Sequence, residues 1–151
     1  MKKSPVKIPK RSYAFVDGSF NPTTKIYGCG GFLIDQFGKR HVIQASGDNE
    51  EWAVMRNVAG ELLGAKKVME LARKLQMKKL IIFYDYDGVA NWPLGIWKAK
   101  KSVTKDYVQF ACSIIACGVK IYFRHVKGHS GISGNEKADR LAKEAVGLLK
   151  K

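Results

Sequence analysis

The 151-residue chain has few cysteines and no long apolar run, and each shortage excludes a class of protein. Its three cysteines, Cys29, Cys112 and Cys117, are an odd number in apolar surroundings. This argues against a disulfide framework and predicts buried thiols in a reducing compartment. No apolar stretch approaches the roughly 18 residues of a membrane span, and the basic N-terminus leads into no segment of signal-peptide type. We therefore expect a cytoplasmic protein with no membrane partner.

Acidic residues are also scarce: 13 Asp and Glu stand against 27 Lys and Arg, which leaves a formal charge of +14. Such a surface attracts phosphate chains by neutralisation and counterion release, so a nucleic acid is the expected partner. A solubilising surface with a basic tail is the alternative that charge alone leaves open. With 46% hydrophobic residues, the chain is expected to fold. We expect a basic, flexible tail over 1–12 and one domain over 13–149.

Apolar periodicity predicts a single α/β domain. Three β-prone runs come first, at 13–16, 26–34 and 41–45, and the turn residues Asp17, Gly18 and Ser19 end the first run. The later segments are a long helix over 52–76, whose apolar face starts at Val54, a buried strand over 80–84, a helical face around 108–115, a strand over 121–123, and a helix opened by a capping box at 133–136. The order β-β-β-α-β-α-β-α predicts a mixed, five-stranded sheet flanked by helices.

Three acidic residues stand where structure alone would not place them, and a fourth is a further candidate. Asp17 and Asp85 directly follow apolar strands, at the carboxyl ends where open sheets bind ligands. Glu61 lies within the apolar face of the long helix, where an ionised carboxylate costs several kcal/mol unless a cation compensates it. Asp139 lies at the margin of the last helix's buried face. If the four converge, their oxygen ligands suit Mg²⁺ or Mn²⁺, and two such ions about 4 Å apart support in-line phosphoryl displacement.

Each of these acids also has a plainer interpretation. Asp17 and Asp85 can be turn residues, and Glu61 can pair with a Lys or Arg. Asp139 can be a surface residue paired with Lys143 four positions later. All four plain interpretations together are less probable than any one of them.

One histidine is placed where it could move protons. His129 stands in a loop flanked by glycines, so its imidazole could act as a mobile proton shuttle, or it is simply a surface histidine. A zinc site made from His125, His129 and the cysteines is disfavoured, because the chain contains no CxxC pair.

Four segments resemble, in order, the active-site segments of type 1 ribonuclease H. They read AFVDGS at 14–19, RNVAGE at 56–61, YDYDGV at 84–89, and VKGHSG at 126–131 leading to NEKAD at 135–139. The resemblance implies the ribonuclease H-like fold. Only 44 residues separate Asp85 from His129, and 12 precede Tyr13. We therefore expect the bacterial type, without a basic protrusion or an N-terminal hybrid-binding domain.

The resemblance implies an endonuclease, a phosphodiester hydrolase that cuts the RNA strand of RNA–DNA hybrids with two divalent metal ions. The products would carry 3′-hydroxyl and 5′-phosphate ends. By position, the ligands of the two Mg²⁺ ions, with Mn²⁺ as a possible substitute, would be Asp17, Glu61, Asp85 and Asp139. His129 would assist turnover. Asp87 is an extra acid beside Asp85, and we favour Asp85 because it directly ends its strand.

The resemblance also implies contacts with the substrate. Asn57 matches a residue that contacts the hybrid in the minor groove, where a 2′-hydroxyl on one strand only distinguishes a hybrid from either pure duplex. The family often has a second Asn or Gln at the next position, where this chain has Val58. Trp97 resembles an aromatic that packs on the DNA strand; Trp92 is the competing choice. We expect further affinity from the basic tail and from a lysine segment that includes Lys98 and Lys101.

Two other functions remain in competition. A non-catalytic module that binds hybrids or double-stranded RNA would need the same basic surface, although it would have no need for four uncompensated acids. Another two-metal nuclease of this fold, such as a transposase or resolvase acting on DNA, would need further DNA-binding or oligomerisation segments. We expect a monomer with no obligate protein partner.

Overall fold

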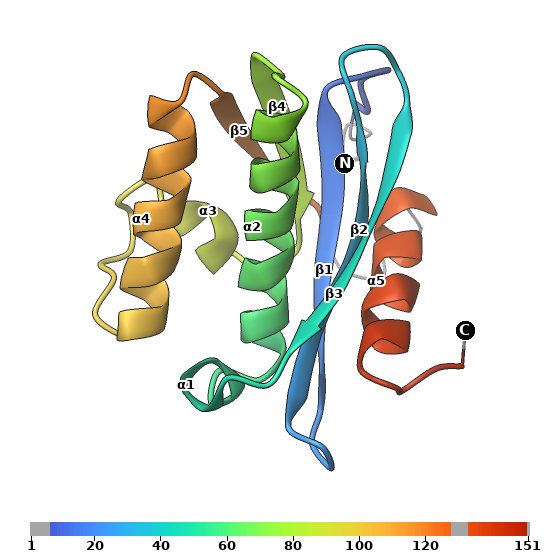
Figure 1. Cartoon of the computed structure of the whole chain (residues 1–151), viewed down its shortest axis with the longest axis vertical. Helices are drawn as coiled ribbons and strands as arrows, with labels where there is room; N and C mark the ends of the chain where they lie inside the picture. The colour runs from blue at the N-terminus through green and yellow to red at the C-terminus, as the bar shows by residue number, and fades with distance from the viewer. Residues whose placement is uncertain (1–6, 128–132, 151) are drawn as a thin grey trace, which may run out of the picture.

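The computed structural model describes residues 7–127 and 133–150, which form a five-stranded sheet with helices on both faces (Figure 1). In chain order the elements are β1 (Tyr13–Asn21), β2 (Ile26–Ile34), β3 (Arg40–Gly47), α1 (Glu50–Ala53), α2 (Asn57–Lys74), β4 (Lys79–Tyr84), α3 (Gly88–Asn91), α4 (Ser102–Ala116), β5 (Lys120–His125) and α5 (Ser133–Ala145). The strand order is β3-β2-β1-β4-β5. The pairs β1–β2 and β2–β3 are antiparallel, and β1–β4 and β4–β5 are parallel. The predicted mixed, five-stranded sheet is confirmed.

The sheet separates two apolar cores. On one face, α2 and α4 pack over a cluster that includes Ala14 and Val16 of β1 (Figure 1). On the other face, α5 covers an aromatic cluster in which Phe15 stacks on Phe83 with ring centroids 4.7 Å apart. Because side chains alternate along a strand, Asp17 shares the α5 face with Phe15, and Gly18 faces α2.

The first strand runs beyond the position where a turn was predicted. That prediction is wrong, because residues 17–19 continue the ladder with residues 28–30 of β2. The parallel ladder with β4 does end early, at the pair Phe15 and Phe83. Asp17 therefore still lies just past the end of the parallel ladder, where β1 and β4 no longer pair.

The long helix predicted over 52–76 is two helices. α1 ends at Ala53 and α2 begins at Asn57, because Arg56 between them has a φ of 56°, outside the range of a right-handed helix. Val54, predicted on the apolar face, lies at this break and is 75% exposed. At 18 residues α2 is the longest helix, and within the described ranges no helix is both long and apolar enough to cross a membrane. The break leaves Glu61 near the N-terminal end of α2.

The prediction of three buried thiols is wrong for two of them. Cys29 is buried in the sheet, and this burial raises the pKa of its thiol to about 12, whereas Cys112 and Cys117 are exposed. α4 turns Ala111 and Ile114 toward the core, so the neighbouring Cys112 points away from it. Cys117 lies at the C-terminal cap of the same helix.

Candidate active site

The structure brings the four singled-out carboxylates into one polar cavity of about 220 Å³. Asp17 comes from β1, Glu61 from α2, Asp85 from the residue after β4, and Asp139 from α5. The cavity therefore lies where β1 and β4 stop pairing, between a helix from each face of the sheet. Its other lining residues are Gly18, Asn57, Asn135 and Glu136.

Glu61 reaches this cavity because α2 lies directly on the backbone of β1. A Cβ atom on Gly18 would lie 2.3 Å from the backbone nitrogen of Glu61 and 2.5 Å from the carbonyl oxygen of Asn57. A Cβ atom on Gly60 would lie 2.0 Å from the carbonyl oxygen of Gly28. Only glycine permits backbones to approach this closely. These glycines therefore set the position of Glu61 relative to Asp17.

α5 is positioned on the opposite face in the same way. A Cβ atom on Gly30 would lie 2.2 Å from the backbone nitrogen of Ala142, so α5 rests on the backbone of β2. Asp139 lies about one turn before Ala142 on this helix. It is close enough to Asp17 for its charge to raise the pKa of that carboxyl.

Glu61 is a buried carboxylate without a cation. It is 4% exposed, and its Oε2 atom has no hydrogen-bond partner among the described residues. Burial raises the pKa of Glu61 well above its usual value, and the hydrogen bond to Asp17 and the charges of Asp17 and Asp85 raise it further; the backbone N–H of Gly18 opposes them. Within the described part of the chain, no Lys or Arg forms an ion pair with it. Pairing with a basic residue therefore does not explain its position.

Asp17 is the second acid with a raised pKa. Burial is the largest cause, and the nearby Asp139 adds to it. Two contacts favour the charged form and oppose the shift: the hydrogen bond with Glu61, and the backbone N–H of Gly18, which donates to Asp17 Oδ1 at 2.9 Å. Asp17 and Glu61 therefore form a carboxyl pair that favours keeping a proton.

Asp139 makes the surface contact that its plainer interpretation predicted, and it also lines the cavity. Its Oδ2 atom lies 3.0 Å from Nζ of Lys143, the residue four positions later. A partly exposed pair of this kind contributes little to stability. The pair is therefore compatible with a second role for Asp139 inside the cavity.

The structure separates Asp85 from its neighbouring acid. Asp85 lines the cavity and contributes to the raised pKa of Glu61. Asp87 is exposed, and its Oδ1 atom lies 3.6 Å from Nε2 of His125. This placement favours Asp85 as the acid that acts with Glu61.

The donor set of the cavity fits a hard divalent cation. All four acids offer oxygen ligands, and the unpartnered Oε2 atom of Glu61 is a buried acceptor that a cation would satisfy. Over residues 7–127 and 133–150, no three Asp, Glu, His or Cys side chains are already grouped closely enough to hold one ion. Asp17 and Glu61 stand as a hydrogen-bonded pair with raised pKa values, so metal binding would require this pair to lose its proton and reorient.

Two cavity residues were not predicted as functional. Asn135 is buried, and Glu136 is exposed at the rim. The available signal was spacing, because Asn135 precedes Asp139 by four residues and so shares its helix face. Glu136 had been assigned only to helix capping.

The predicted substrate-binding residues lie around the cavity. Asn57 lines it and is exposed. Lys98 and Lys101 line a neighbouring hollow of about 260 Å³ together with Trp92. Trp97 is 38% exposed and packs edge-on against Trp92, with ring centroids 5.5 Å apart.

His129 lies outside the described residues. The nearest described residues on either side of it are Lys127, which is exposed, and Ser133, which begins α5.

Comparisons with known proteins agree with this architecture. The sequence model of the RNase H family matches residues 9–147. Ribonuclease H of Francisella tularensis subsp. novicida is 29% identical over 154 residues, which cover 95% of each chain. Human ribonuclease H1 is 36% identical over 101 residues, or 60% of this chain and 35% of that protein, so the match spans about a third of its length.

Solved structures match the fold. The crystal structure of RNase H1 from Halobacterium salinarum has a TM-score of 0.72 at 19% identity and covers 89% of this chain and 96% of that one. LC11-RNase H1, isolated from compost by a metagenomic approach, has a TM-score of 0.70 at 19% identity and covers 91% and 96%. The family match extends over most of the sequence and includes all four carboxylates of the cavity. The chain belongs to the RNase H family.

Proposed function

We propose that the chain is an endonuclease that hydrolyses the RNA strand of RNA–DNA hybrids. The observation that carries the proposal is Glu61, a buried carboxylate that meets three further acids in one cavity and has an oxygen with no hydrogen-bond partner in the described part of the chain. Such an anionic cavity in a chain of charge +14 combines an attraction for phosphate chains with a site that needs cations. Membership of the RNase H family supports the choice of substrate.

Asp17, Glu61, Asp85 and Asp139 would hold two Mg²⁺ ions, with Mn²⁺ as a substitute. When bound, the ions would activate water for attack on phosphorus and offset charge on the leaving oxygen, which leaves 3′-hydroxyl and 5′-phosphate ends. Asp17 and Glu61 would act by giving up the proton that their raised pKa values favour, and all four side chains would fix the two metal positions relative to each other. His129 would assist turnover by moving a proton near the leaving group.

The residues around the cavity would bind and select the hybrid. Asn57, at the cavity rim, would contact the minor groove, where the 2′-hydroxyls mark the RNA strand. Trp97, which is more exposed than Trp92, would pack against the DNA strand. Lys98 and Lys101 would contact phosphates from the hollow beside the cavity.

The direct test is cleavage of an end-labelled RNA–DNA hybrid beside matched RNA–RNA and DNA–DNA duplexes. Each substrate is incubated in Mg²⁺, in Mn²⁺ and in excess chelator. We expect the RNA strand of the hybrid alone to be cut, only with metal, and the products to accept a 3′-end extension without prior treatment. Tight, salt-sensitive binding without cleavage in either metal would instead identify a binding module, and cleavage of the DNA duplex would identify a DNA nuclease.

Deletion of residues 1–11 is expected to weaken substrate binding more than catalysis. The deleted segment carries five Lys and Arg and ends before Ser12, whose backbone N–H donates to Ile34 O at 2.9 Å in the sheet. The folded domain and its cavity should therefore remain. Steady-state kinetics on a short hybrid should give a raised KM with kcat changed less. An unchanged KM would contradict a substrate-binding role for this segment.

A further inference from the structure

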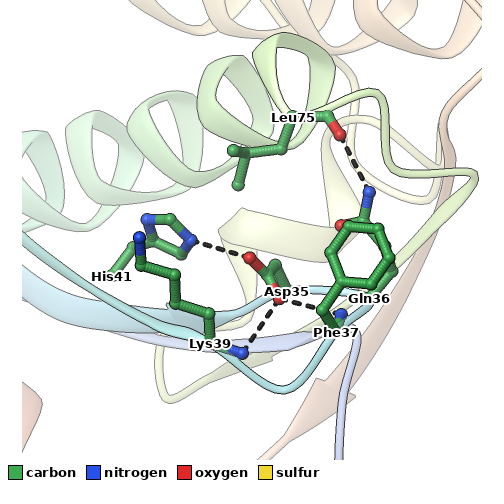
Figure 2. Close-up of polar contacts among 6 residues, drawn as sticks. All are labelled: Asp35, Gln36, Phe37, Lys39, His41 and Leu75. Atoms are coloured by element: carbon green, nitrogen blue, oxygen red, sulfur yellow. Dashed lines mark hydrogen bonds and ion pairs between the residues drawn. The ribbon is translucent and has the colours of Figure 1, made fainter.

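An exposed aromatic ring stands at the tip of the turn between β2 and β3. Phe37 is 86% exposed, although burying a ring of this size is normally favourable. Its turn is nonetheless well ordered by hydrogen bonds (Figure 2). Asp35 accepts from the backbone N–H of Phe37 at 2.8 Å, from that of Lys39 at 2.9 Å, and pairs with His41 Nε2 at 2.9 Å. Phe37 is therefore displayed on a fixed support.

The same turn is tied to the end of α2. Nε2 of Gln36 donates to the carbonyl oxygen of Leu75 at 2.9 Å (Figure 2). Asp35, which organises the turn, has a pKa held below its usual value, first by the hydrogen bond from His41. The ring of Phe37 is thus presented beside the residues that follow α2.

Basic residues lie near the turn that carries this ring. A hollow of about 400 Å³ is lined by Arg11, Gln36, Lys78 and Lys79, and Lys39 lies two residues after Phe37. Across the described ranges, none of these four cations pairs with a carboxylate. We call Arg11, Phe37, Lys39, Lys78 and Lys79 the distal patch.

The distal patch lies away from the carboxylate cavity. Lys79 begins β4 and Asp85 follows its last residue, and six residues of strand span about 20 Å. Figure 1 shows the β2–β3 turn, the end of α2 and the start of β4 at the same end of the molecule. A ligand bound to the distal patch therefore need not occupy the carboxylate cavity.

We propose that the distal patch binds single-stranded nucleic acid, with a base stacked on Phe37 and the neighbouring phosphates on the Lys and Arg side chains. An exposed aromatic ring held on an ordered turn, next to cations that have no carboxylate partner among the described residues, is the combination that single-strand binding uses. Every base has a face that can stack on a ring, and every nucleotide has a phosphate that can contact a cation. A base within a duplex is already stacked on both sides and cannot use a lone ring. An acidic peptide would contact the cations but would make no stacking contact with the ring. A role for the distal patch in hybrid cleavage rests on the proposed function. In that role, the single strand on the patch would be an extension of the hybrid that is bound at the carboxylate cavity.

The binding test measures the affinity of the full chain for a labelled 12-nucleotide oligo(dT) in the presence of chelator. Fluorescence anisotropy of the label reports how much oligonucleotide is bound. Phe37→Ala should weaken binding by about 5- to 140-fold, the range that alanine substitution of base-stacking aromatics produces. Phe37→Trp should bind about as well as the wild type. Val42→Ala, which truncates an exposed apolar side chain on the neighbouring strand β3, is the matched control and should have no effect. Because Phe37 is exposed, its variants should keep the melting temperature of the wild type.

The cations have a separate readout. In the double variant Lys78→Gln and Lys79→Gln, the slope of log affinity against log salt should fall by about 1.4, since each phosphate contact to a single strand contributes about 0.7. Oligo(dT) binding that is unchanged in Phe37→Ala would overturn the proposal. A second outcome would also overturn it. If a glutamate peptide of equal charge displaced the oligonucleotide equally well from the wild type and from Phe37→Ala, the surface would recognise charge alone.

A second assay connects the patch with cleavage. A hybrid with a 12-nucleotide single-stranded extension, about 40 Å long even at stacked spacing, should show a lower KM than a blunt hybrid. Phe37→Ala should remove this difference and leave kcat on the blunt hybrid unchanged; a difference that persists would contradict the proposal. If no hybrid is cut in any metal, the proposed function fails and the oligo(dT) measurement still decides the patch.

Discussion

Replacing Glu61 with Gln is expected to slow cleavage severely and at the same time to stabilise the metal-free protein. Gln keeps the shape of the side chain but carries no charge, so it removes the cost of a buried carboxylate without a cation. The expected gain in the free energy of unfolding is about 1–3 kcal/mol near neutral pH. Cleavage should fall by about a hundredfold or more, because an uncharged amide is a poor ligand for the ions. Urea unfolding and hybrid cleavage measure the two effects.

The stability gain should depend on pH in one direction. The pKa of Glu61 is raised in the folded chain above the value near 4.5 expected after unfolding, so the folded state holds the proton more tightly. The wild type therefore loses stability as pH rises through the interval above 4.5, while Glu61→Gln does not. The difference between the two should be small at pH 4 and largest at pH 8.

The control is Glu70→Gln on the same helix. Glu70 pairs with Lys74 at 3.4 Å on the surface, so its substitution should change stability by less than about 0.5 kcal/mol and leave cleavage intact. The account of Glu61 is wrong if Glu61→Gln cuts hybrids at the wild-type rate. It is also wrong if the variant is less stable than the wild type in chelator at pH 8.

A single methyl group on Gly60 is expected to destabilise the protein and displace its catalytic helix. The new Cβ atom would lie 2.0 Å from the carbonyl oxygen of Gly28, so α2 would have to move away from the sheet. Overpacking of this severity costs about 3 kcal/mol, which exceeds the roughly 1 kcal/mol that Ala gains over Gly in a helix. Because Glu61 is the next residue, cleavage should fall together with stability.

Gly64→Ala, one turn later on the same helix face, is the matched control. Its Cβ atom would lie 3.1 Å from Cys29 Cβ and 3.3 Å from Val16 Cβ, contacts that small shifts can relieve. The gain in helix propensity offsets them, so stability should stay within about 1 kcal/mol of the wild type. Thermal unfolding and cleavage of both variants test the comparison. Equal effects of the two substitutions would contradict the idea that backbone contact at Gly60 positions α2.

The carboxylates could be found from sequence because a charged residue in an apolar pattern is a local anomaly. Glu61 interrupts a helix face, and Asp85 ends a continuous apolar strand. Asp17 was selected for the wrong local reason, since β1 continues past it. Asp17 nevertheless lies just past the end of the parallel ladder, because the pairing of β1 with β4 stops at Phe15. Which strands pair, and where the pairing stops, depends on the whole sheet and cannot be read from the local sequence.

Other features depend on contacts that the sequence pattern does not display. The break before α2 rests on a positive φ at Arg56, a residue type with no special preference for that conformation. The cavity residues Asn135 and Glu136 belong to it only because α5 lies on Gly30. Apolar patterns predicted the five strands and the apolar faces of α2, α4 and α5, whereas the close approach of the backbones decided which residues meet.

The most direct measurement is a Mg²⁺ titration of RNA-strand cleavage in a hybrid by the wild type and by Asp17→Asn. The central claim is that the carboxylate cavity is the metal-dependent catalytic site. It predicts no cleavage in chelator and a saturable rise with Mg²⁺ for the wild type. Asp17→Asn should bind the hybrid comparably but cut it at least about a hundredfold more slowly. Cleavage that persists in chelator, or an Asp17→Asn variant as active as the wild type, would contradict it.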